Sequence, residues 1–296
     1  MPFELFLQYL LSGITSGSIY AIVAIGFNII YNTTGIINFA QGEFVMLGAM
    51  SAISFSAFLP LPAAIACAVV VTSIVGGVVE LLFIRWLRNP GVLRMIIITI
   101  GVSILLREAA LHVWDEKVRS LPYFTGNECS SISVFGAHIS PQVLWVLGVC
   151  AAMVLFLSLF FKRTLTGRSM RACSANRTAA ALCGINAKNM VTFSFMLSAA
   201  IGALAGCVIS PLTQTHYECG TPLAIKGFTV AILGGLGNTM AAVTAGLLLG
   251  VIEAFSISVM PVAYKDVIAI AVLLAILFFK PSGIFGNKEE GRLKEF

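Results

Sequence analysis

The chain has 296 residues, of which 58% are hydrophobic and only 10% are charged, and its formal net charge is +5. Soluble globular domains contain about 45–50% apolar and about 25% charged residues, so this composition excludes an ordinary soluble protein and indicates a polytopic membrane protein. The basic residues lie mainly in loops and in the C-terminal tail, as orientation in a membrane requires, and so do not indicate nucleic-acid binding.

The first predicted element is a transmembrane helix over residues 5–31. No charged side chain occurs between Leu5 and Gly42, a stretch longer than the ~20 residues that one span requires. Small residues such as Gly13 and Gly17 would let a neighbouring helix approach closely. The polar run 32–35 then predicts a turn.

A second helix is predicted over residues 36–58, and it is unusual because it contains Asn38, Gln41 and Glu43. Such groups are costly in hydrocarbon, so we expect them to face protein or water. Two interpretations stay open. The three side chains line a transport path, or they lie at the membrane boundary and only cap and brace the start of the helix.

Three further spans and an outer loop follow. We predict spans over residues 63–84, 95–114 and 141–161, because each is an apolar run of about 20 residues. Residues 115–140 mix acidic and basic side chains with glycine and serine, which predicts a hydrated loop on the outer side.

Residues 162–188 form the one long segment that cannot lie in a bilayer. The segment has no Asp or Glu, and its six basic residues are Lys162, Arg163, Arg168, Arg171, Arg177 and Lys188. Cations collect in cytoplasmic loops, so the segment is predicted to be cytoplasmic, and fixing orientation is the simplest role for these charges. Its inner pattern also predicts a short helix, with Gly167 in front and Gly184 placed to end it.

The C-terminal part begins with a span over residues 189–212, which has a face of small residues suited to close packing. The run 227–236 that follows is interrupted by glycine, at Gly234, Gly235 and Gly237. This short helix would reach only ~18 Å across a hydrocarbon core of ~30 Å. A broken helix at that depth must be buried in protein or line a cavity.

Two more spans, over residues 239–258 and 264–280, precede a basic tail that belongs in the cytoplasm. The sequence therefore predicts an all-α fold, with a single transmembrane domain over residues 1–296. We expect about eight or nine transmembrane helices, at least one of them broken.

Signatures of catalysis and of metal binding are missing. The sequence contains no G-x-x-x-x-G-K-[ST], no H-E-x-x-H and no G-x-S-x-G, so it predicts neither an ATP site nor an enzyme. The seven cysteines form no C-x-x-C, which gives no support to a metal site, and no cofactor is expected. Cys129 and Cys219 fall in predicted outer loops, where oxidising conditions would let them form a disulfide.

Three stretches carry a resemblance to a known family. They are Gly13–Ala49, which contains N-F-A-Q-G-E-F; Gly167–Asn186, which reads G-R-S-M-R-A-C-S-A-N-R-T-A-A-A-L-C-G-I-N; and Ala231–Gly250, which begins A-I-L-G-G-L-G-N-T. Together they resemble the permease subunits of bacterial and archaeal ABC importers for branched-chain amino acids, over nearly the full length. The N-F-A-Q-G-E-F block resembles the shorter of the two related permeases of such importers.

The resemblance implies a multi-pass protein of the cytoplasmic (inner) membrane with several partners. These would be a second related permease, two cytoplasmic ATPase subunits that bind the ATP, and an extracytoplasmic substrate-binding protein. The lipid bilayer would surround the permease pair, and ATP-driven closure of the ATPases would switch that pair between inward-open and outward-open states.

The resemblance also implies a role for the basic loop. In this family a short cytoplasmic helix docks in a cleft of the ATPase, and the matching residues here are Arg168, Arg171, Arg177, Thr178, Ala179, Ala180 and Gly184. The family pattern is E-A-A followed by a glycine. Thr178 stands where the pattern has Glu, which puts in doubt any salt bridge from that position and leaves the alanine surface and the helix stop intact.

Other transport functions stay open at this point. The same importer type could carry urea, short amides or other amino acids, because substrate choice rests largely with the outer binding protein. An ion-coupled secondary transporter would suit the broken helix and would use Glu43 or Glu253 as the coupling carboxylate. A purely structural membrane scaffold is a third alternative.

Overall fold

The computed structural model describes residues 3–87, 91–127, 130–134, 136–258, 260–261, 264–280 and 283–284. Within these residues the chain is predominantly helical, which confirms the predicted all-α fold. The elements are α1 (Phe3–Thr34), α2 (Gln41–Ser56), α3 (Leu61–Val79), the π-helix η1 (Glu80–Ile84), α4 (Val92–Trp114), β1 (Ile132–Val134), β2 (Ala137–Ile139), α5 (Pro141–Arg163), α6 (Leu165–Ala175), α7 (Arg177–Leu182), α8 (Ala187–Thr213), α9 (Gly220–Gly234), α10 (Thr239–Ser256) and α11 (Lys265–Phe279).

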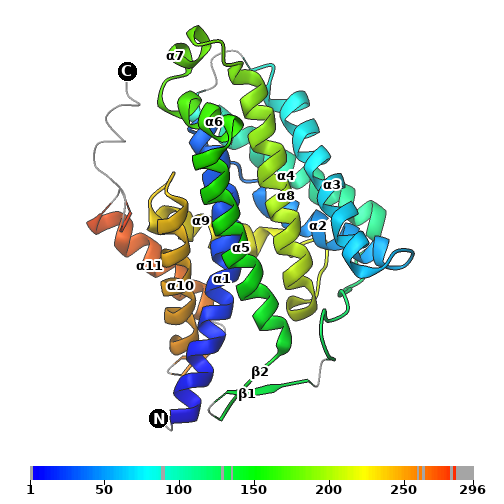
Figure 1. Ribbon diagram of the computed structural model, residues 1–296. Coiled ribbons are helices and arrows are strands. Elements are labelled where there is room, and N and C mark those ends of the chain that lie inside the picture. Colours follow the sequence, from blue (N-terminus) through cyan, green and yellow to red (C-terminus); the bar gives the residue numbers. More distant parts are fainter. Residues whose placement is uncertain are drawn as a thin grey trace.

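Helices α1 and α8 form the centre of the bundle. Figure 1 shows α10 and α11 on one side of them and α2, α3 and α4 on the other. Every residue of α1 from Ser18 to Ile30 is buried, as is most of α8 from Ser198 to Pro211. Both helices are apolar on all sides, which is the pattern of a helix surrounded by protein or lipid.

Small residues let α1 and α10 pack closely. A Cβ atom added to Gly17 would lie 2.6 Å from the carbonyl oxygen of Gly246, and one added to Gly13 would lie 2.7 Å from the Cα atom of Val251. Such backbone approach gains van der Waals contact where lipid provides no hydrophobic driving force. The predicted packing role of the small residues in the first helix is thus confirmed.

The two ends of the molecule differ. The N-terminal end of α1 and the antiparallel β1–β2 hairpin lie at one end, and α6 and α7 lie at the other (Figure 1). The side chain of Gln8 joins α1 to the hairpin, donating to the carbonyl oxygen of His138 and accepting from its amide. We call the end with α6 and α7 the inner end, because its cations predict a cytoplasmic location, and the other the outer end.

Six helices among the described residues are long and apolar enough to cross a membrane: α1, α3 with η1, α4, α5, α8 and α10. The predicted count of eight or nine also included α2, α9 and α11, which have 16, 15 and 15 residues. The chain is therefore a multi-pass membrane protein in which several shorter helices pack against the long ones.

The second and seventh predicted helices have different boundaries from those expected. Residue 36 was expected to begin a helix, but α2 begins only at Gln41, because Gly35 has a positive φ of 72° and the Asn38 side chain accepts a hydrogen bond from the amide of Ala40. Helix α9 begins at Gly220 rather than at residue 227. The chain after α8 thus turns back into the bundle, where Gly220 packs against Gly42.

Candidate functional site

The segment from α6 to α7 closes the inner end of the bundle. Thr164 caps α6 by accepting a hydrogen bond of 3.0 Å from the amide of Gly167. Gly167 then packs against α5, where an added Cβ atom would lie 2.8 Å from the Cα atom of Phe161. Because Met170 and Cys173 are also buried, α6 is anchored to the bundle along one face.

Helix α7 has a defined start and a defined stop. The Asn176 side chain caps its start by accepting from the amide of Ala179 at 2.9 Å. At its end Gly184 has a φ of 81°. The amide of Ile185 donates to the carbonyl of Ala180, and the amide of Gly184 donates to the carbonyl of Ala181. This pattern is a Schellman motif, in which glycine takes the left-handed position without strain.

The expectation of one helix between Gly167 and Gly184 was wrong in two respects. Asn176 has an extended backbone (φ −156°, ψ 111°), so it divides the segment into α6 and α7. Gly167 lies inside α6 rather than in front of it. An asparagine that caps the following helix ends the preceding one, and the sequence pattern alone did not distinguish this from a helix interior.

The residues predicted to contact an ATPase lie on the outside of this segment, with one exception. Arg168, Arg171, Arg177, Thr178, Ala179 and Gly184 are exposed, whereas Ala180 is buried within the chain itself. Leu182 is 87% exposed at the end of α7. Helix α7 thus attaches through Ala180 and presents the rest of its surface, including an aliphatic side chain, outside the bundle.

Asn38, Gln41 and Glu43 are all buried, and the last two join helices. Gln41 accepts a hydrogen bond of 2.6 Å from the hydroxyl of Ser198 in α8 and donates to the Ser198 carbonyl at 3.3 Å. The carbonyl oxygen of Gly26 in α1 lies 2.7 Å from the same hydroxyl, as a second acceptor for its one proton. These contacts match the bracing interpretation, in which the polar groups hold α1, α2 and α8 together.

Glu43 connects three elements. Its Oε1 atom accepts hydrogen bonds from Ser103 in α4 at 3.0 Å and from Thr221 in α9 at 3.3 Å. Its Oε2 atom and the Nδ2 atom of Asn38 are buried without a hydrogen-bond partner among the described residues. That Asn38, Gln41 or Glu43 lines a transport path stays a prediction.

The glycine-rich break separates α9 from α10. Helix α9 ends at Gly234, and Gly235 and Gly237 have φ values of 95° and 98°. Two asparagines of α1 hold the turn: Asn28 accepts from the amide of Gly237 at 3.0 Å, and Asn32 donates to its carbonyl at 2.8 Å. The amide and the carbonyl of Gly237, which lie outside any helix, are thereby hydrogen-bonded within the protein. Backbone that is not helical must be paired in this way within a membrane.

A charged cluster that the sequence analysis missed joins α9, α10 and α11. Glu253 is fully buried and lies 3.5 Å from the Nζ atom of Lys226 and 3.4 Å from that of Lys265. Lys226 also pairs with Asp266 at 2.8 Å. Glu253 had been considered only as a coupling carboxylate. The sequence feature that could have predicted this cluster is Lys226, because a single cation in an apolar run needs an acidic partner.

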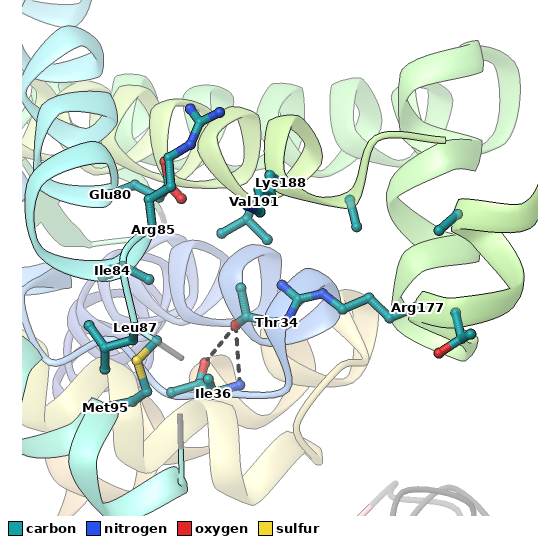
Figure 2. Close-up of a pocket in the computed structure, with 13 residues that line it drawn as sticks. Thr34, Ile36, Glu80, Ile84, Arg85, Leu87, Met95, Arg177, Lys188 and Val191 are labelled. Atoms are coloured by element: carbon teal, nitrogen blue, oxygen red, sulfur yellow. Dashed lines mark hydrogen bonds between the residues drawn. The ribbon is translucent and has the colours of Figure 1, made fainter. Parts of the chain in front are cut away.

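A cavity of about 460 Å³ lies at the inner end, between α7 and the bundle. We call it the inner cavity. Figure 2 shows Arg177 reaching from α7 toward Thr34 at the end of α1, with Glu80 and Arg85 on the opposite side. Cations, one carboxylate and aliphatic side chains therefore share one space.

Comparison with known families decides the classification. The family model described as "Branched-chain amino acid transport system / permease component" matches residues 9–277, which include every element described above except the first residues of α1 and the last of α11. The chain belongs to this permease family. Its three diagnostic stretches correspond to the α1–α2 junction, the α6–α7 segment and the α9–α10 break.

Individual relatives of this permease cover almost its whole length. The permease protein BraD of a high-affinity branched-chain amino acid transport system of Pseudomonas aeruginosa is 37% identical, over 96% of this chain and 97% of its own. LivH of Escherichia coli K12, with the same description, is 34% identical over 97% of both chains. A probable branched-chain amino acid transport permease, LivH of Methanocaldococcus jannaschii, is 25% identical over 91% of this chain and 89% of its own.

Of the two cysteines of the predicted disulfide, Cys219 and Cys129, only Cys219 is among the described residues. Cys219 lies directly before α9 and is half-buried. Cys129 lies outside the described residues, so the disulfide stays a prediction.

Proposed function

We propose that this permease is a membrane subunit of an ATP-driven importer for branched-chain amino acids in the inner membrane. It would act with a second related permease, two cytoplasmic ATPase subunits and an extracytoplasmic binding protein. The family membership and the names of the relatives support the transport class and the substrate.

The observation that carries the ATPase proposal is the exposed surface of α7. Leu182 is an aliphatic side chain on a short helix at the inner end, and it gains almost no burial from the chain's own core. Thr178 and Ala179 are exposed on the same helix. A short helix with a small-residue face and an aliphatic anchor suits docking in a groove of a partner protein.

In this mechanism α7 transmits the movement of the ATPase to the bundle. Helix α6 is anchored to α5 through Gly167, so displacement of α7 would act on α5 and α8, which flank the α6–α7 segment. ATP binding can favour one state of the permease only if the ATPase contacts that state more strongly. The contact through α7 would supply this difference.

The buried carboxylates argue against the ion-coupled alternative. A coupling carboxylate must bind and release a cation, yet Glu253 is already held between Lys226 and Lys265. Glu43 accepts hydrogen bonds from two hydroxyl groups. These contacts favour structural roles for both groups.

The experiment is co-purification of the permease with its ATPase subunits in mild detergent. We expect Leu182→Asp to remove most of the bound ATPase, because a charge would enter the docking groove unpaired. Val118→Asp is the matched control, since Val118 is also an exposed aliphatic residue but belongs to the predicted outer loop. Equal ATPase recovery with both variants would overturn the docking role of α7.

A further inference from the structure

The inner cavity has a polar part that is lined by side chains of both charges. Glu80, in the π-helix η1, is buried, and its Oε2 atom accepts a 2.6 Å hydrogen bond from Thr192. Arg85, Arg177 and Lys188 also line the cavity. None of these four residues forms an ion pair with any described residue of the chain. Glu80 also lies in a π-helix, and π-helices are frequent at functional sites.

The rest of the cavity is aliphatic. Among the described residues its apolar lining consists of Ile36, Ile84, Leu87, Met95, Ala181, Ala187 and Val191, and no aromatic side chain is among them. Figure 2 shows Ile84, Leu87 and Met95 grouped on the side away from Arg177. The volume of about 460 Å³ is within the range of roughly 300–1,000 Å³ typical of small-molecule sites.

We propose that the inner cavity binds a free amino acid with an aliphatic side chain. The ammonium group would pair with Glu80, the carboxylate with Arg177, and the side chain would contact the aliphatic lining. A plain anion such as phosphate fits less well, because it would meet Glu80 as a like charge and leave the aliphatic surface unused. The substrate class rests on the proposed function, whereas the existence of the site rests on the cavity alone.

Such a ligand would connect α7 to the rest of the bundle. Arg177, Thr178 and Ala181 come from α7, whereas Glu80, Ile84 and Met95 come from η1 and α4. A ligand held between them restrains α7 relative to the bundle. Since the cavity lies at the inner end, internal amino acid would slow the cycle that imports more of it, as an allosteric ligand acts through differential binding to two states.

The first experiment measures binding to the purified permease in lipid nanodiscs by isothermal titration calorimetry. We expect leucine to bind. Two analogues should bind at least about tenfold more weakly, because each loses one ion pair: leucinol lacks the carboxylate, and 4-methylpentanoate lacks the ammonium group. Arg177→Gln should abolish leucine binding, and because the Arg177 side chain is exposed we expect the variant to fold normally. Arg163→Gln is the control, because Arg163 is an exposed cation at the same end that does not line the cavity.

The outcomes separate the proposal from its rivals. Binding of phosphate or of an anionic lipid without leucine binding would overturn it, as would leucine binding that Arg177→Gln leaves unchanged. Met95→Trp, which fills the cavity with an apolar side chain, should also remove leucine binding and provides a second test that changes no charge.

The second experiment tests regulation in proteoliposomes that contain the assembled importer. We expect internal leucine to reduce the initial uptake rate by about fivefold, and Glu80→Gln to relieve this inhibition. Normal uptake without inhibition would refute the regulatory role and leave the proposed function intact. Absence of uptake under all conditions would instead refute the proposed function, while the calorimetry would still decide whether the site exists.

Discussion

The phenol of Tyr20 in α1 donates a 2.8 Å hydrogen bond to Oε2 of Glu253 in α10, although the two residues are 233 positions apart. Lys226 lies over the ring of the same tyrosine, 5.2 Å from its centroid, and donates to its hydroxyl at 3.2 Å. One buried carboxylate therefore connects α1, α9, α10 and α11.

Glu253→Ala should destabilise the permease strongly. Removing the carboxylate leaves Lys226 and Lys265 without their buried partner, which costs about 3–5 kcal/mol for a buried pair. The measurement is the melting temperature in detergent. Asp266→Asn is the control, because Asp266 is 73% exposed and its ion pair with Lys226 is screened by solvent. Equal melting temperatures for the two variants would contradict the central role of Glu253.

The close approach of α1 and α10 predicts that the same substitution, Gly to Ala, has different effects at two positions. Gly17→Ala should lower the melting temperature, because the added Cβ atom meets the backbone of Gly246 at 2.6 Å and overpacking costs about 1–3 kcal/mol. Gly148→Ala, in α5, meets nothing within 4 Å, so it should leave the melting temperature unchanged or raise it. A drop of the same size in both variants would show that the effect is not due to packing.

Two cysteines of the α6–α7 segment should react differently with a maleimide. Cys183 is exposed beside Gly184, whereas Cys173 is buried, and burial raises the pKa of the Cys173 thiol although the nearby Arg177 lowers it. The thiolate is the reactive form, so at neutral pH Cys173 should react slowly and its reaction should accelerate only as the pH rises toward the elevated pKa. Peptide mapping by mass spectrometry would measure both rates.

Bound ATPase should protect Cys183 in the same labelling experiment. Cys183 follows Leu182 directly, so docking of α7 would cover it. The protection should disappear in Leu182→Asp. Unchanged labelling of Cys183 in the assembled importer would mean that this surface stays open.

The sequence predicted the long helices well, because a span of about 20 apolar residues has few alternatives. The inward turn after α8 was missed, since Thr221 and Gly220 read as an outer loop, and only their packing against Glu43 and Gly42 reveals their depth. The pairing of Lys226 with Glu253 depends on how α9 packs against α10, which no local pattern specifies. The division at Asn176 was missed because its capping role depends on its backbone conformation.

The most direct measurement of the central claim is leucine uptake into proteoliposomes that contain this permease, the second permease and the ATPases, with the binding protein outside. We predict uptake that requires ATP on the ATPase side, persists when ionophores collapse all ion gradients, and is lost in Leu182→Asp. Uptake by this chain alone, driven by an ion gradient and insensitive to ATP, would contradict the account.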